Sequence, residues 1–212
     1  MGRKAVYFIN TDREFGYVSY HVWDILQEEG YFTEQAGFTF DGIYTGYLGS
    51  FEQIDLMKEF FDDFRTEDNL ILVDPAMADN GKLYPAFDMD YVEAMKKLCA
   101  KADIILPNIT EACFMTGEKF IEGVQTEEYI VNLMNKLLDM GSKSVVLTGV
   151  SFDESKVGAA CMGEDRVPHY YFENRLPGAY HGTGDVFASA FCGALLNDFS
   201  LEASMGIAAR YV

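Results

Sequence analysis

The sequence predicts an α/β fold in which a mostly parallel sheet is covered by helices. Short apolar segments that resemble strands alternate along the chain with longer segments that resemble helices. This alternation is typical of parallel strands joined by crossover helices. The chain has 212 residues, enough for one such domain with a substantial core. It shows no internal repeat and no long linker, and we expect a single domain over residues 1–212.

The expected strands are apolar runs that stop at polar, proline or glycine residues. Proline and glycine interrupt strands, so Pro75, Pro107 and Gly149 set three of the boundaries. The last two segments predict a hairpin that turns at residues 163–165. In chain order the expected strands are residues 4–10, 42–45, 70–74, 104–106, 144–148, 157–162 and 166–172.

The expected helices lie between these strands and follow them. Gly30 and Gly141 come directly after two of the helical segments, where glycine commonly ends a helix. Thr126 is placed to cap the start of another. In chain order the expected helices are residues 18–29, 52–64, 91–100, 126–140, 184–196 and 201–212.

Composition and charge restrict the possible functions. The net charge of −18 argues against binding nucleic acid through the general field of the protein. A single ATP remains possible, because backbone N–H groups and a magnesium ion can hold its phosphates. There is no apolar run of membrane-spanning length, and the first apolar stretch is too short for a signal peptide. We therefore expect a cytoplasmic protein without membrane or nucleic-acid partners.

Cysteine and histidine usage does not indicate a metal site. The four cysteines form no CxxC pair and lie in apolar contexts, so buried, reduced thiols are expected. His21 and His169 stand alone, and His181 has only a glycine-containing turn beside it. Neither a Ser–His–Asp set nor a zinc spacing is present.

The most specific local pattern is His181-Gly182-Thr183-Gly184-Asp185, directly before an apolar helix. The glycines let the backbone approach a ligand, and the helix N-terminus adds partial positive charge. Together they could form an anion hole for a phosphoryl group in transfer. Asp185 would accept the proton of the attacking hydroxyl group. The alternative is that Asp185 only caps the helix.

Two further clusters follow expected strands. Asn108 and Glu111 share one face of a starting helix and could hold a magnesium ion directly or through water, although a helix-capping arrangement is the alternative. Asp74 and Asp79 flank a turn and could face a metal–phosphate group, or could belong to a plain turn. Tyr47 stands between two glycines, and its ring could stack on a flat ligand or lie in the core.

In this order, the clusters resemble those of the pyridoxal/pyridoxamine kinase family of the ribokinase-like superfamily. The resemblance covers most of residues 38–212 and is closest to the bacterial pyridoxamine-kinase-like branch. It implies a ribokinase-like three-layer α/β/α sandwich with a mostly parallel central sheet. The segments that carry it are FDGIYTGYLGS (40–50), LILVDPAMADNGKLY (70–84), ADIILPNITEACFMTG (102–117), VVLTGVS (145–151) and YHGTGDVFASAFCGALL (180–196).

The resemblance implies transfer of the γ-phosphoryl group of ATP to the 5′-hydroxymethyl group of pyridoxal, pyridoxamine or pyridoxine, with Mg²⁺ as the metal ion. It makes Asp185 the catalytic base, also in contact with the substrate. The anion hole would consist of Gly182, Thr183 and Gly184. A homodimer is the assembly that the resemblance implies.

The resemblance also implies which residues bind the nucleotide with its metal ion and which bind the vitamin. Asp74 and Glu111 are the implied magnesium residues. Thr11 takes the place of a family serine that touches the pyridine ring, and Tyr47 is the implied ring contact. The residues implied to bind ATP and its phosphates are Asp74, Asn108, Glu111, Thr148 and Tyr84.

The sequence also departs from the family. Only residues 31–38 connect the first expected helix to the strand 42–45, where the family carries two strands and a substrate loop, and the chain ends inside a helix that the family continues. We therefore expect part of the lid and of the C-terminal elements to be lacking. Ala76 and Ala78 stand where the family has a bulkier residue and a glycine. Two alternatives remain: a hydroxymethylpyrimidine kinase or other ribokinase-like small-molecule kinase, and a shortened, non-catalytic nucleotide-binding homologue.

Overall fold

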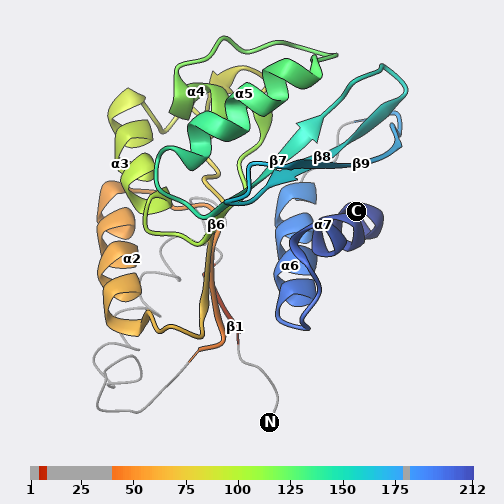
Figure 1. Ribbon diagram of the computed structural model, residues 1–212. Coiled ribbons are helices and arrows are strands. Elements are labelled where there is room, and N and C mark those ends of the chain that lie inside the picture. Colours follow the sequence, from red (N-terminus) through yellow and green to blue (C-terminus); the bar gives the residue numbers. More distant parts are fainter. Residues whose placement is uncertain (1–4, 9–39, 179–181) are drawn as a thin grey trace.

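The computed structural model describes residues 5–8, 40–178 and 182–212, which form a seven-stranded sheet flanked by helices (Figure 1). The strand order is β1-β2-β3-β6-β7-β8-β9. In this sheet β1, β2, β3, β6 and β7 are parallel, whereas β8 and β9 are antiparallel to their neighbours. The strands are β1 (Ala5–Phe8), β2 (Gly42–Thr45), β3 (Leu70–Val73), β6 (Ile104–Ile105), β7 (Ser144–Val150), β8 (Lys156–Met162) and β9 (Pro168–Asn174).

Helices cover both faces of this sheet. The helices α2 to α5 lie on one face and α6 and α7 on the other (Figure 1). A two-stranded hairpin of β4 (Ala78–Asp79) and β5 (Lys82–Leu83) lies outside the main sheet. The helices are α2 (Phe51–Phe64), α3 (Met89–Cys99), α4 (Ile109–Thr116), α5 (Glu127–Leu138), α6 (Thr183–Leu195) and α7 (Leu201–Tyr211).

Each face of the sheet has its own apolar core. Ile43 and Val73 pack with the helices α2 to α5, whereas Tyr44 and Leu72 pack with α6 and α7. This separation follows from the strand geometry, because successive side chains point to opposite faces. It also explains why the central strands β3 and β6 are apolar without interruption, as expected for strands buried on both sides.

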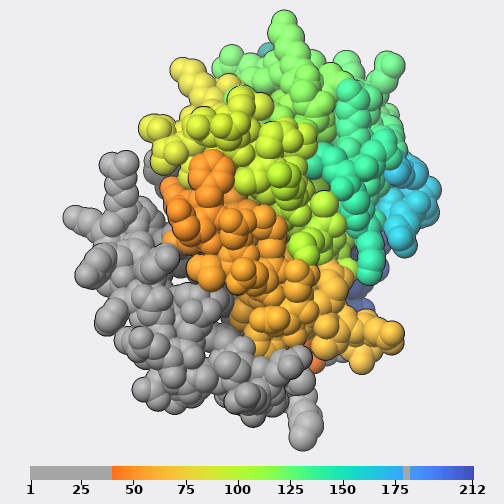
Figure 2. Space-filling view, turned by 90° about the vertical axis from the view of Figure 1, so that its left-hand side faces the viewer, coloured from red at the N-terminus to blue at the C-terminus, as the bar shows by residue number. Residues whose placement is uncertain are grey.

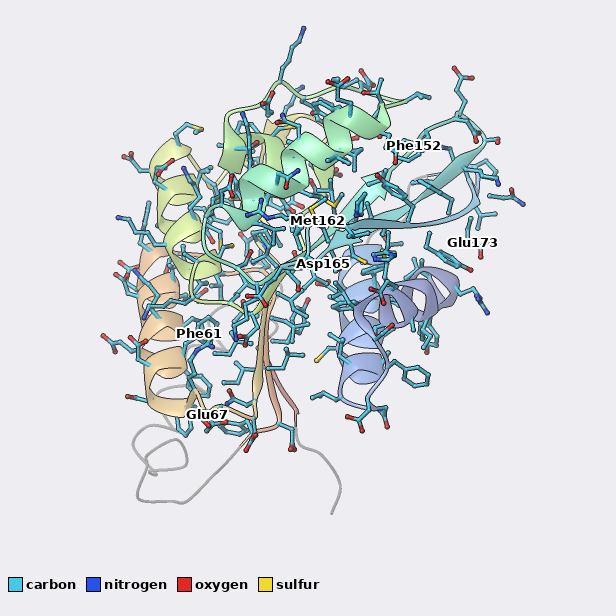
Figure 3. The ribbon with its side chains drawn as sticks, viewed as in Figure 1. Phe61, Glu67, Phe152, Met162, Asp165 and Glu173 are labelled. Carbon is cyan, nitrogen blue, oxygen red and sulfur yellow. The ribbon has the colours of Figure 1, made fainter. Side chains whose placement is uncertain are left out.

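The helix α2 illustrates how the larger layer is built. Phe61 points from α2 toward the sheet (Figure 3) and is 1% exposed. In the space-filling view, α2 and α3 lie side by side and cover this face (Figure 2). Side chains cap most helix starts: the N-caps with a side-chain hydrogen bond are Ser50, Asp88, Asn108, Thr126 and Ser200.

The predicted α/β/α arrangement with a mostly parallel sheet is confirmed. Within the described residues, each expected strand and helix is present with its ends within a few residues of the prediction, and the hairpin turns where expected. The predicted helix 18–29 lies outside the described residues. The sequence predicted only a turn at β4–β5 and only a helix start at Asn108, where the structure has a hairpin and the complete helix α4.

Two smaller expectations also concern this part of the chain. The four cysteines are all buried and unpaired, as the sequence predicted: Cys99, Cys113, Cys161 and Cys192. Among the helices that the structure describes, none has both the length and the hydropathy needed to cross a membrane.

Candidate active site

The predicted site residues gather where the parallel strands end. Asp74 follows β3 directly, and Asn108 is the third residue after β6. Asn108 forms an isolated parallel bridge with Thr148 of β7, and the Thr148 N–H donates to the Pro107 carbonyl oxygen over 3.0 Å. Ligands of open α/β sheets bind beyond the carboxyl ends of the strands. The topology therefore brings these residues, far apart in sequence, to one edge of the sheet.

Asp74 is a buried carboxylate in the middle of this edge. Its backbone N–H donates to the Thr45 carbonyl oxygen over 2.8 Å, which extends the pairing of β2 with β3 by one residue. The Tyr44 hydroxyl donates to Asp74 Oδ2 over a long 3.5 Å. Burial, followed by the negative charge of Asp185, raises the pKa of Asp74 to about 7, while the hydrogen bond from Tyr44 opposes this shift.

The start of α6 is the only N-terminus among the described helices without a side-chain cap. Its N-cap is Gly182, which has φ of 83° and no side chain to accept from the first-turn N–H groups. That left-handed conformation explains the glycine. The first-turn N–H groups of a helix have no acceptor within the helix, so an anion can take this place.

Asp185 lies in the first turn of α6 and is exposed. The alternative that it caps the helix is wrong, because the cap residue is Gly182 and no side-chain cap hydrogen bond is present. A Cβ atom built on Gly46 would lie 3.8 Å from Asp185 Oδ1. The carboxylate of Asp185 is thus exposed in the first turn of α6 and faces the loop that follows β2.

Asn108 and Glu111 form a complete capping box at the start of α4. Asn108 Oδ1 accepts from the Glu111 N–H over 2.9 Å, and Glu111 Oε2 accepts from the Asn108 N–H over 2.8 Å. Glu111 Oε1 also accepts from the backbone N–H groups of Met77 and Ala78, over 3.0 and 3.4 Å. Asn108 and Glu111 therefore form the helix-capping arrangement. This arrangement leaves the Glu111 carboxyl group buried behind the loop that follows β3.

The charge of Glu111 is coupled to that of Asp74. Burial and the neighbouring Asp74 raise the pKa of Glu111 well above its usual value, against the effect of its backbone donors. Asn108 Nδ2 donates to the Ala78 carbonyl oxygen over 2.8 Å, so the same pair also fixes the hairpin that follows Asp74. Asn108 and Glu111 therefore hold helix α4 and the hairpin together. The carboxyl groups of Glu111 and Asp74 also concentrate negative charge at the same place.

A cluster of aromatic rings lies near this edge of the sheet. The half-buried Tyr47 lies with its ring centroid 5.5 Å from Phe87 and 6.4 Å from Tyr84. Phe87 in turn stacks on Tyr91 at 3.9 Å. Burial, followed by the charges of Glu111, Asp79 and Asp74, raises the pKa of Tyr84 to about 12. Tyr47 thus has one face in an aromatic cluster and remains partly exposed.

Some predicted residues are not brought into this cluster. The exposed Asp79 carboxylate accepts from the N–H and the side-chain amide of Asn80, and the turn continues through Gly81 with φ of 75°. Asp79 therefore belongs to a plain turn, which was the alternative to a contact with a metal–phosphate group. Thr11 and His181 lie outside the described residues. Sequence reasoning missed Tyr44, whose only available signal was the strand alternation that places it on the α6 side of β2.

A magnesium ion fits the chemistry of these donors. Asp74 has two further carboxyl groups near it: the charge of Asp185 raises the pKa of Asp74, and the charge of Asp74 raises the pKa of Glu111. A divalent cation would relieve this repulsion. In the described part of the chain, no group of three or more His, Cys, Asp or Glu side chains surrounds a common metal position. An ion held here by one or two carboxylates would take its remaining ligands from nucleotide phosphates and water.

Comparison with known proteins adds a family context to this geometry. A family model described as phosphomethylpyrimidine kinase matches residues 31–212. A pyridoxal kinase of Dictyostelium discoideum is 29% identical over 185 residues, which cover 80% of this chain and 59% of the relative.

Two solved structures are similar as well. One is a Bacteroides thetaiotaomicron protein assigned as a phosphomethylpyrimidine kinase and crystallised with pyridoxal, at a TM-score of 0.77 and 36% identity, covering 84% of this chain and 63% of the other. The second is a Staphylococcus aureus pyridoxal kinase in complex with ADP, at a TM-score of 0.68 and 25% identity, covering 79% and 59%. The chain spans about three fifths of the length of these relatives.

Proposed function

Because the chain belongs to the phosphomethylpyrimidine kinase family, we propose that it transfers the γ-phosphoryl group of ATP to the 5′-hydroxymethyl group of a vitamin B6 compound. One observation carries the proposal. The uncapped, glycine-initiated helix α6 presents the exposed carboxylate of Asp185 at the edge of the sheet where Asp74 also lies. An anion-binding helix start, a base and a metal-binding carboxylate are the components that phosphoryl transfer requires.

In the proposed reaction, Asp185 accepts the proton of the substrate hydroxyl group while the hydroxyl oxygen forms a bond to the γ-phosphorus atom. The bond between that phosphorus and the β–γ bridging oxygen breaks, and ADP leaves with the electron pair. The N–H groups at Gly182, Thr183 and Gly184 hold the charge of the transferring group. The products are ADP, the phosphorylated vitamin and the proton taken by Asp185.

The remaining residues bind and orient the two substrates. Asp74 would supply a carboxylate to the magnesium ion, and Glu111 would act through water, because its oxygens already accept three backbone hydrogen bonds. When bound, the ion would neutralise phosphate charge. Asn108, Thr148 and Tyr84 contact the phosphates. Tyr47 and Thr11 contact the pyridine ring.

The choice of vitamin B6 over a pyrimidine rests on the relatives. The Dictyostelium relative is a pyridoxal kinase, and the Bacteroides structure contains pyridoxal. The family description names phosphomethylpyrimidine, which supports hydroxymethylpyrimidine as a second candidate substrate. Magnesium as the metal ion, a homodimer and a cytoplasmic location remain predictions.

The decisive experiment is a substrate panel with the chain as it stands. Pyridoxal, pyridoxamine, pyridoxine and hydroxymethylpyrimidine are each incubated with ATP and Mg²⁺, and ADP release is measured together with the mass of the product. We expect phosphorylation of at least one B6 compound, and loss of turnover when EDTA is added. Preference for the pyrimidine would support the second candidate. Nucleotide binding without turnover on any substrate would indicate a non-catalytic homologue and contradict the proposal.

A further inference from the structure

Tyr44 connects the two strands whose ends form the candidate site. It lies in β2 on the face that packs against α6, and its side chain is 1% exposed. Its hydroxyl donates to Asp74 Oδ2 across the β2–β3 pair, over 3.5 Å. A tyrosine that only filled the core would not need its hydroxyl directed at a buried carboxylate.

The loop after β2 brings the same hydroxyl close to α6. A Cβ atom built on Gly46 would lie 3.3 Å from Tyr44 Oη and 3.8 Å from Asp185 Oδ1. The hydroxyl of Tyr44 and the carboxylate of Asp185 therefore border one small space, which the absence of a side chain at Gly46 keeps open. Tyr44 is thus placed between the carboxylates of Asp74 and Asp185.

We propose that Tyr44 is a positioning residue for the metal–nucleotide complex, because its hydroxyl holds the Asp74 carboxylate in the orientation that binds the ion. This inference rests on the proposed function. The backbone of Asp74 is already fixed by its hydrogen bond to the Thr45 carbonyl oxygen, over 2.8 Å. The remaining freedom of Asp74 is the rotation of its side chain, and the Tyr44 hydroxyl restricts that rotation through Oδ2. Among the described residues, the side-chain hydrogen bond to Asp74 is made at Oδ2, so the proposed contact with the cation is assigned to the other oxygen, Oδ1.

The chemistry of Tyr44 suits this role. The Tyr44 side chain is buried, and its hydroxyl is the donor in the contact with Asp74. An ionised carboxylate only accepts hydrogen bonds. A hydrogen bond to a charged group contributes more than a neutral one, and its loss leaves a buried carboxylate without its donor.

The test is Tyr44→Phe, which keeps the buried ring and removes only the hydroxyl. Binding of a non-hydrolysable ATP analogue is measured by calorimetry with Mg²⁺ and again with EDTA. We expect Kd with Mg²⁺ to rise about 10-fold, as for loss of one charge-assisted hydrogen bond, while Kd in EDTA is unchanged. In turnover, KM for Mg·ATP should rise more than kcat falls.

Tyr129→Phe is the matched control. It also removes one tyrosine hydroxyl, which donates to the Lys119 carbonyl oxygen over 2.8 Å, on the opposite helical layer. We expect both of its Kd values to equal those of the wild type. Equal Mg²⁺-dependent Kd values for Tyr44→Phe and the wild type would overturn the inference. If the wild type itself fails to bind the Mg²⁺–analogue complex, the proposed function is contradicted instead.

A double mutant separates positioning from general destabilisation. If Tyr44 acts through Asp74, then Tyr44→Phe in an Asp74→Asn background should weaken Mg²⁺–analogue binding no further than Asp74→Asn alone. Additive losses in the double mutant would show that Tyr44 acts independently of Asp74 and would overturn the inference. This cycle also decides the matter if Tyr44→Phe alone lowers the stability of the fold.

Discussion

The side chains of Asn108 and Glu111 each accept a hydrogen bond from the backbone N–H of the other, over 2.9 and 2.8 Å. The pair begins helix α4, and Glu111 also accepts from the N–H groups of Met77 and Ala78 in the loop after β3. One buried carboxyl group therefore fixes both a helix start and the segment that follows Asp74. Structural and functional roles coincide at this position, and variants at Glu111 will report both.

Glu111→Ala should strongly destabilise the fold. The change removes the acceptor for three backbone N–H groups in a buried setting, and unsatisfied buried donors are costly. We expect the free energy of unfolding in urea to fall by about 2–4 kcal/mol. Glu118→Ala is the control: this Glu118 carboxylate pairs with Lys136 near the surface, and its removal should cost less than about 1 kcal/mol. Equal losses for both variants would contradict the capping role of Glu111.

Asp185→Asn should abolish most turnover without disturbing nucleotide binding. Asparagine keeps the shape of the side chain but cannot accept the proton of the substrate hydroxyl, and a general base contributes about 10²–10⁴-fold to the rate. The measurements are steady-state kcat and the Kd for the Mg²⁺–ATP-analogue complex. Asp165→Asn, in the exposed turn between β8 and β9, is the control and should behave as the wild type. A near-normal kcat for Asp185→Asn would show that Asp185 is not the base.

Stability should fall as the pH rises through the range in which Asp74 ionises. The pKa of Asp74 is raised from 3.8 to about 7 by burial and by Asp185. Between these values the folded protein holds a proton that the unfolded chain has released, so this contribution is fully present below pH 3.8 and is lost toward pH 7. Asp74→Asn should remove this fall, measured as unfolding free energies in urea with EDTA at about pH 5 and about pH 7, worth roughly 1.4 kcal/mol per pKa unit.

Asp103 provides the control of opposite sign. Burial acts to raise its pKa, but the hydrogen bond from Lys143 and the donor at Ile71, together with the charge of Arg65, lower the pKa overall. Its contribution to stability is therefore present above its unfolded pKa and lost as the pH falls. Asp103→Asn should lower the unfolding free energy at neutral pH and have less effect in acid. A loss for Asp74→Asn that also grows toward neutral pH would contradict the assignment at Asp74.

The sequence predicted elements well where local signals were strong. The strand 42–45 has the predicted bounds because polar and glycine residues delimit a short apolar run, and Thr126 caps α5 as expected. The helix α4 was recognised only at its start. It has eight residues and is apolar on several faces, because Ile109, Ala112, Cys113 and Met115 are all buried, so helical periodicity is weak.

The site could be predicted only in part, for a related reason. Strand ends indicated Asp74 and Asn108, since ligands of parallel sheets bind there. The coupling of Asp74 with Asp185 depends on where α6 crosses the sheet, which no sequence spacing specifies. The contribution of Tyr44 depends on which face of β2 meets α6. Local patterns therefore supplied candidate residues, and tertiary packing determined which of them lie together.

Gly182→Ala and Gly117→Ala form a matched pair that separates backbone strain from loss of the anion site. Both glycines are left-handed, with φ of 83° and 73°, and a Cβ atom at either would meet no atom of the described residues within 4 Å. Each variant should therefore lose a similar amount of unfolding free energy, about 1–2 kcal/mol. Only Gly182 begins the helix that would bind the transferring phosphoryl group, whereas Gly117 ends α4. We expect kcat to fall at least about 10-fold for Gly182→Ala alone, as for loss of part of an oxyanion-type site. Equal kcat values for the two variants would show that the start of α6 does not bind the phosphoryl group.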